Sequence, residues 1–165
     1  MNMRPASPTG IFDGPLHLYA VRAFYEDTDL SGVVYHANYL KWFERARSDM
    51  LRLIGIDQRA AVEAGEGAYA VADMSIRYTS PARLDDEVVI ETALEELGAA
   101  SVRLVQRAFR GDAVKGQVLL AQAQVRVGFV APDGRPRRQP APWRSAFAAF
   151  LSSSSQPAAI DQGQS

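Results

Sequence analysis

The sequence contains no cysteine, and only Lys41 and Lys115 among its 18 basic residues are lysines. Without cysteine the chain has no disulfide framework, no thiolate nucleophile and no cysteine-based metal site. Any chemistry must therefore come from carboxylates, hydroxyls, the two histidines and backbone amides. The excess of arginine fits recognition of phosphate or carboxylate groups, and a bias in genomic composition explains it equally well.

Long apolar runs are also missing, so no segment reads as a membrane-spanning helix. Residues 1–14 interleave proline, glycine and aspartate where a secretory signal peptide needs a continuous apolar stretch. The net charge of -1 lacks the basic balance of a nucleic-acid-binding protein. These absences predict a cytoplasmic protein with no membrane insertion and no nucleic-acid partner.

The length of 165 residues suits one domain with a hydrophobic core and is too short for two ordinary ones. Both ends are rich in small and polar residues that offer little to bury. We therefore predict a disordered N-terminal extension over residues 1–16, one domain over residues 17–151 and a disordered tail over residues 152–165.

A single long amphipathic helix is the clearest element. Apolar residues recur at steps of three and four between Tyr39 and Leu53, and Gly55 fits the position just after a helix end. The segment before it, residues 17–25, is rich in Tyr, Val and Phe and predicts a strand. Glu44 and Arg47, three residues apart on the helix, predict a weak surface pair.

Alternating patterns after the helix predict strands separated by short turns. The last of them is the most regular, because one face carries only apolar residues: Leu119, Ala121, Ala123, Val125, Val127 and Phe129. A short helix over residues 143–151 closes the chain. The order predicts an α+β fold in which a five- or six-stranded antiparallel sheet wraps the long helix. The other sheet face and the sheet edge are then available to a second subunit, so we expect a homo-oligomer.

The loop between the first strand and the helix, residues 25–39, carries the chemistry. It brings carboxylates, a turn glycine and a histidine to a helix N-terminus, where free backbone amides can stabilise an oxyanion. A carboxylate there can act as nucleophile or general base. Two alternatives stay open. One is a calcium loop that begins at Asp27, although Asn38 stands where its last ligand should be. The other is simple turn capping by Asp27, Thr28 and Ser31.

The run YEDTDLSGVVYHANYLKWFERARSDML, which starts at Tyr25, resembles the signature of the 4-hydroxybenzoyl-CoA thioesterase family, in particular its YbgC-type, Tol-Pal-associated acyl-CoA thioesterase branch. The resemblance continues in the run RYTSPARLDD from Arg77 and covers roughly residues 17–150. It implies a hot-dog fold with active sites between paired subunits, and many members form dimers of dimers.

The resemblance also assigns roles by position. It implies that Asp29 is the catalytic carboxylate, that the helix begins at His36 with an amide that polarises the thioester carbonyl, and that Tyr25 and the His36 side chain belong to the active site. Glu44 and Arg47 fall within the matching motif, which leaves a supporting role open to them. The implied contacts to substrate or CoA are Tyr35, Pro81, Arg83 and Ser101. Related sequences often have an arginine and a glycine before the serine that matches Ser101, whereas this chain has Gly98-Ala99-Ala100.

These implications define an acyl-CoA thioesterase that needs no metal and no organic cofactor. Resemblance to the YbgC branch implies short-chain acyl-CoA as substrate, and thioesters of acyl carrier protein as a further one. We expect the acyl pocket to be built by residues 69–74 and the helix. Two rivals remain: a hot-dog hydratase or dehydratase acting on the same thioester, and an acyl-CoA-binding module without turnover.

Overall fold

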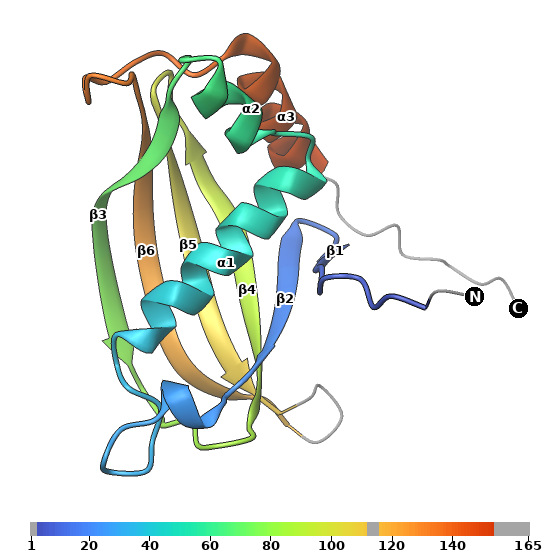
Figure 1. Cartoon of the computed structure of the whole chain (residues 1–165), viewed down its shortest axis with the longest axis vertical. Helices are drawn as coiled ribbons and strands as arrows, with labels where there is room; N and C mark the ends of the chain where they lie inside the picture. Colours follow the sequence, from blue (N-terminus) through green and yellow to red (C-terminus); the bar gives the residue numbers. More distant parts are fainter. Residues whose placement is uncertain (1–2, 112–115, 154–165) are drawn as a thin grey trace, which may run out of the picture.

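A computed structural model describes residues 3–111 and 116–153 of the chain. One antiparallel sheet of six strands curves around a long helix (Figure 1), as the sequence predicted. The strands are β1 (Ile11–Asp13), β2 (Leu16–Arg22), β3 (Ala68–Tyr78), β4 (Glu87–Leu97), β5 (Ser101–Arg110) and β6 (Val118–Val130), and their order across the sheet is β1-β2-β4-β5-β6-β3. The helices are α1 (Asn38–Leu53), α2 (Gln58–Glu63) and α3 (Ala141–Ser153), with a 3₁₀ turn, η1, at Tyr25–Asp27.

Helix α1 crosses the concave face of the sheet and buries its apolar side there (Figure 1). Trp42, Phe43 and Met50 are each at most 1% exposed, and burial of each such side chain contributes about 1.5–3 kcal/mol. The helix ends where predicted. The Ile56 amide donates to the Leu51 carbonyl and the Gly55 amide to the Arg52 carbonyl, while Gly55 takes a φ of +87°. This is a Schellman motif, in which glycine adopts the left-handed conformation without strain.

The apolar face of β6 is confirmed with one shift. Residues 121, 123, 125, 127 and 129 are buried, but Leu119 is only half-buried and Leu120 lies in the core instead. The pairing with β5 steps from Ala108–Ala121 to Phe109–Leu119, which leaves Leu120 as an extra residue. A β-bulge of this kind reverses the alternation of side chains beyond it, and a simple period of two does not predict it.

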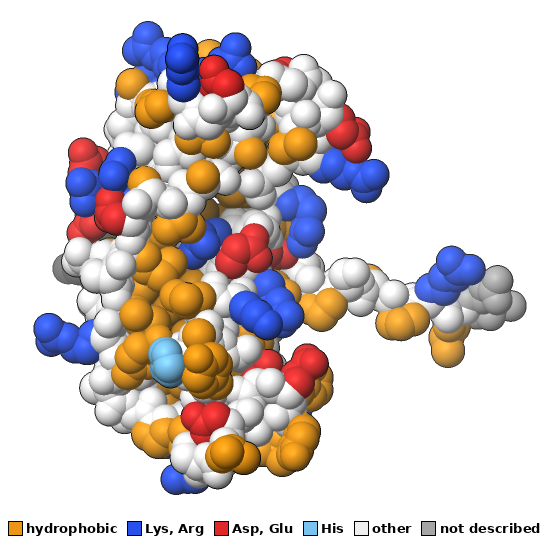
Figure 2. All heavy atoms as spheres, turned by 60° about the vertical axis from the view of Figure 1, so that its left-hand side comes forward, with side chains coloured by type: hydrophobic (Ala, Val, Ile, Leu, Met, Phe, Trp, Pro, Cys, Tyr) orange, Lys and Arg blue, Asp and Glu red, His pale blue; other side chains and the backbone are white. Residues whose placement is uncertain are grey.

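Strand β3 forms one edge of the sheet, and most of its side chains are exposed. Its inner side pairs with β6, and its outer row of backbone groups has no strand partner among residues 3–111 and 116–153. The face on the β3 side is hollowed, and a band of hydrophobic side chains runs down it (Figure 2). An open edge of 11 residues next to an apolar face is the kind of surface that a second chain covers.

Three predictions about element bounds are wrong. The first long strand ends at Arg22 because the chain turns into η1 at Tyr25. Residues 11–13, which we expected to be disordered, form β1 and pair with β2. The segment after α1 is not entirely β-structure, because residues 58–63 form α2 with Asp57 as its N-cap. The predicted tail, residues 152–165, lies mostly outside the described residues.

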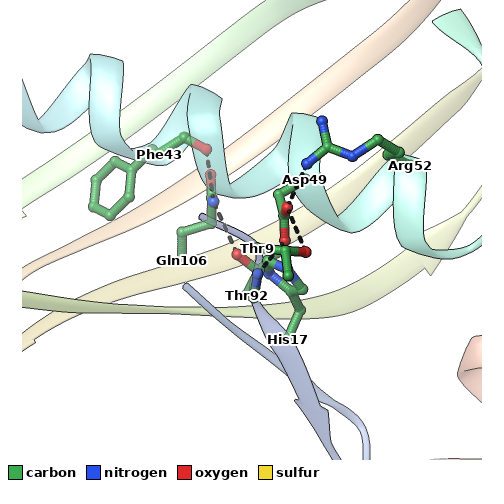
Figure 3. A network of polar contacts seen from close by, with 8 residues as sticks. Thr9, His17, Phe43, Asp49, Arg52, Thr92 and Gln106 are labelled. Carbon is green, nitrogen blue, oxygen red and sulfur yellow. Dashed lines mark hydrogen bonds and ion pairs between the residues drawn. The ribbon is translucent and has the colours of Figure 1, made fainter. Parts of the chain in front are cut away.

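A buried polar cluster explains why the N-terminal segment is ordered. The Asp49 carboxylate on α1 contacts His17 Nε2 at 2.8 Å and accepts from the Gly10 amide at 2.8 Å, and it also binds Thr9 and Arg52 (Figure 3). His17 is fully buried, and burial lowers its pKa despite the nearby carboxylate. Gly10 must be glycine, because a Cβ there would lie 2.4 Å from the Leu18 carbonyl oxygen. Through Asp49, His17 connects β2 to α1 and to the N-terminal segment, a role that no local sequence pattern indicates.

Candidate active site

The loop between β2 and α1 is held in shape by its own polar groups. The Asp27 carboxylate accepts from the Phe24 amide at 2.8 Å, and the Asp27 carbonyl accepts from the Tyr35 amide at 2.8 Å. The buried Asn38 side chain, oriented to suit both neighbours, donates to Asp27 and accepts from Trp42. The turn-capping role expected for Asp27 is therefore confirmed, and the loop is anchored to the first turn of α1.

Asp29 lies at the outer bend of this loop with an exposed side chain. Its Oδ1 accepts from the Ser31 amide at 2.8 Å and from the Ser31 hydroxyl at 2.5 Å. The hydroxyl and then the amide of Ser31 lower the pKa of the Asp29 carboxyl, and His36 adds a smaller electrostatic effect. The backbone of Val33 also lowers this pKa. The side chain remains exposed, so an ionised and oriented carboxylate is accessible for chemistry.

Two free backbone amides lie at the end of the same loop, just before α1. Within the described ranges, the amides of His36 and Ala37 donate no hydrogen bond. Ala37, the N-cap of α1, has no side chain that could cap the helix. Helix N-termini favour negative charge, and unpaired amides there are suited to stabilise an oxyanion.

Aromatic side chains surround His36. Its ring lies 4.4 Å from that of Tyr35 and 6.2 Å from that of Tyr78, centroid to centroid. The Tyr78 hydroxyl donates to the His36 carbonyl at 2.6 Å. The side chains of His36, Tyr35 and Tyr78 are all exposed at the surface. Strand β3 thus fixes the backbone that precedes α1.

The loop after β3 joins the same site. Val34 donates to the Ala82 carbonyl at 2.8 Å, and Val33 forms an isolated bridge with Arg83. Pro81 and Arg83 are exposed there, and Tyr25 is 84% exposed on η1. The structure therefore brings together six of the seven predicted site residues: Tyr25, Asp29, Tyr35, His36, Pro81 and Arg83.

Ser101 does not join them within one chain. It begins β5 at the far end of the sheet, because β4 runs the length of the sheet between Arg83 and the turn that precedes Ser101. The 11 residues of β4 span about 35 Å at the usual strand rise. A ligand that contacts both Asp29 and Ser101 would need Ser101 from another copy of the chain.

The calcium-loop alternative conflicts with the elements around the loop. A strand, β2, and a single 3₁₀ turn precede it, where a calcium-binding loop of that type needs a helix. Asp27 and Asp29 each bind neighbouring backbone amides. Residues 3–111 and 116–153 contain no group of three or more side chains suited to hold a metal ion.

Comparison with known proteins places the chain in a family. Residues 31–117 match the model of the thioesterase superfamily. The acyl-CoA thioester hydrolase YbgC of Escherichia coli O6:H1 is 40% identical over 126 residues, which cover 76% of this chain and 90% of the relative. The chain therefore belongs to the thioesterase superfamily, and the predictions of the family and of an enzyme of the thioesterase class are confirmed.

Solved structures support the same assignment. A probable thioesterase from Bartonella henselae superposes with a TM-score of 0.69 at 34% identity, covering 76% of this chain and 99% of that one. The 4-hydroxybenzoyl-CoA thioesterase of Pseudomonas sp. strain CBS-3 has a TM-score of 0.71 at 23% identity, with 79% and 98% covered, and this likeness concerns the fold. The predicted hot-dog fold is confirmed. Among the described helices, none combines the length and the apolar character that crossing a membrane requires.

The contact between Ser31 and Asp29 gives a testable pH dependence. Ser31→Ala removes the hydroxyl that contributes most to the lowered Asp29 pKa, so that pKa should rise toward its ordinary value. If the ionised carboxylate is the active form, the acid limb of the kcat/KM profile moves to higher pH while the plateau near neutrality changes little. The measurement is a pH–rate profile beside that of Ser145→Ala, an exposed serine on α3. Coincident profiles for both variants and the native protein would contradict a role for Asp29 as the titrating group.

Proposed function

We propose that the chain hydrolyses acyl-CoA thioesters to a free acid and CoA, with Asp29 as nucleophile or general base. The observation that carries the proposal is the presence, in one loop, of an exposed, ionised carboxylate and of two unpaired amides before α1. A relative at 40% identity is named an acyl-CoA thioester hydrolase. Thioester hydrolysis requires a carboxylate to attack or to activate water and donors to stabilise the oxyanion, and the loop supplies both.

Either route uses the same geometry. As nucleophile, Asp29 Oδ2 adds to the thioester carbonyl carbon, the C–S bond breaks, and water then hydrolyses the acyl–aspartyl anhydride. As general base, Asp29 takes a proton from a water molecule that adds to the same carbon. Both routes place negative charge on the carbonyl oxygen, where the amides of His36 and Ala37 would stabilise it. Both release CoA as a thiol.

The proposed substrates are short-chain acyl-CoA and thioesters of acyl carrier protein. Tyr25 and the His36 side chain would line the reacting group, and Tyr35, Pro81, Arg83 and Ser101 would contact the substrate or CoA, with arginine suited to the CoA phosphates. A cavity of about 110 Å³ between α1 and β3 includes Tyr69 and Val71, within the segment predicted to form the acyl pocket. The reaction requires neither a metal nor an organic cofactor, and we propose the cytoplasm as its location.

A homo-oligomer of two or four copies is part of the proposal. The open edge of β3 and the apolar band beside it supply a surface for a second copy. The separation between Asp29 and Ser101 gives a second reason, because two copies can bring both residues to one substrate. The active site would then lie between subunits.

The decisive assay follows release of the CoA thiol from short, long and aromatic acyl-CoAs, with the free acid quantified in parallel. We expect one thiol and one acid per thioester, and fastest turnover on short chains. A hydratase would consume a 2-enoyl-CoA without releasing thiol, and a binding module would bind acyl-CoA and leave it intact. Either result would refute hydrolysis as the function.

A further inference from the structure

Arg47 is the least expected residue of α1. It was predicted to pair with Glu44 at the surface, yet it is only 8% exposed and forms no ion pair with a carboxylate among the described residues. Its guanidinium donates to Gln106 Oε1 at 2.9 Å. Burial lowers the pKa of Arg47, although the guanidinium remains charged at neutral pH. The Glu44 carboxylate offsets part of this lowering electrostatically, but a buried cation that lacks a direct ion pair is still costly in the free protein.

The surroundings of Arg47 fix its position. Gln106 is fully buried, and its amide nitrogen donates to the Phe43 carbonyl at 3.0 Å and to the Thr92 hydroxyl at 2.9 Å (Figure 3). Those two bonds orient the Gln106 oxygen toward Arg47. The guanidinium therefore cannot swing away without leaving a buried oxygen unpaired, which carries its own cost.

The remaining guanidinium surface lines the cavity between α1 and β3. This cavity of about 110 Å³ has apolar walls that include Leu104, Val127 and Phe147. Its rim carries Glu44 and Val71, whose side chains are exposed. The Glu44 carboxylate accepts from the Ser48 hydroxyl at 2.6 Å and forms no ion pair with Arg47. An apolar pocket with one fixed cation inside it matches an apolar chain that ends in an anion.

We propose that Arg47 binds a carboxylate at the far end of the acyl group, so that the enzyme prefers acyl-CoAs derived from dicarboxylic acids. This inference rests on the proposed thioesterase function and specifies its substrate class. The apolar walls would hold the methylene chain, and the planar guanidinium would bind the terminal carboxylate through charge-assisted hydrogen bonds. The anion would supply the direct ion pair that Arg47 lacks among the described residues of the free protein.

The test compares pairs of acyl-CoAs with equal carbon number, one ending in a methyl group and one in a carboxylate, over a series of chain lengths. We expect kcat/KM to favour the carboxylate by about ten- to a hundred-fold at the length that fits, the usual contribution of hydrogen bonds to charged groups. Arg47→Met should remove that preference and change kcat/KM for the methyl-ended partner less than about threefold. Glu44→Gln should raise the preference, because it removes a like charge from the rim.

The outcomes separate this inference from the proposed function. Hydrolysis of methyl-ended substrates with no preference for the carboxylate overturns the role of Arg47 and leaves the thioesterase intact. A preference for the carboxylate that survives in Arg47→Met also overturns the role of Arg47. Loss of the preference in Glu44→Gln would overturn it as well, because Glu44 would then be the group that selects the substrate. Arg47→Lys keeps the positive charge and serves as a control variant. The melting temperature of each variant shows whether it is folded. No hydrolysis of any acyl-CoA by the native protein refutes the proposed function itself.

Discussion

Asp29→Asn is expected to lower kcat for acyl-CoA hydrolysis by about 10²- to 10⁴-fold, the usual contribution of a positioned acid–base or nucleophilic group. The amide keeps an oxygen that can accept from Ser31, so the loop should hold its shape. It loses the negative charge and the basicity that either route requires. The effect should appear in kcat rather than KM, because Asp29 acts in the transition state more than in substrate binding.

Glu26→Gln is the matched control for this variant. Glu26 lies three residues earlier in the same loop, carries the same kind of charge and is exposed. It should retain nearly full activity, since it contacts neither Ser31 nor the start of α1 in the described structure. Steady-state thiol release on a short-chain acyl-CoA measures both variants. Equal rates for Asp29→Asn and Glu26→Gln would remove Asp29 from the mechanism.

Asp49→Ala is expected to cost about 2–6 kcal/mol of unfolding free energy, because it leaves two buried donors without an acceptor at about 1–3 kcal/mol each. The carboxylate is 2% exposed and accepts from His17 and from the Gly10 amide. Without it, the buried His17 Nε2–H and the Gly10 amide lose their acceptor. Burial alone would raise the pKa of Asp49, but the bonds from His17, Gly10 and Thr9 outweigh burial and lower that pKa, so Asp49 is charged at neutral pH.

Two variants sharpen the Asp49 measurement. Arg52→Ala removes the exposed partner of the same carboxylate, and it should cost less than about 1 kcal/mol because exposed ion pairs contribute little. Asp49→Asn keeps an acceptor and should lie between the two. Urea unfolding gives the three free energies under one condition. A loss of equal size for Asp49→Ala and Arg52→Ala would show that the cluster does not fix the N-terminal segment to α1.

Local patterns predicted the parts of the fold that depend on neighbours in sequence. The spacing of apolar residues and Gly55 placed α1 and its end, and the period of two placed β6. The parts that failed depend on contacts between distant residues. His17 and Asp49 are 32 positions apart, so no local pattern connects them, and the strand β1 that they help to hold was read as disordered.

The site was predictable to a similar extent. The loop from Tyr25 to Asn38 is continuous in sequence, and six of the predicted site residues lie in it or in the loop after β3. Arg47 was misread because arginine on a helix is usually a surface residue, and its burial depends on Gln106 in β5. That glutamine lies 59 positions away, and only the folded sheet brings it beneath α1.

The most direct measurement of the central claim is a crystal structure of Asp29→Asn with a short-chain acyl-CoA that the variant does not turn over. We expect the thioester carbonyl oxygen to lie about 2.7–3.1 Å from an amide at the start of α1. We also expect the residue 29 side chain to face the carbonyl carbon and a second copy of the chain to contribute to the site. A thioester bound away from residues 29 and 36, with no amide of that loop near its carbonyl, would contradict the account.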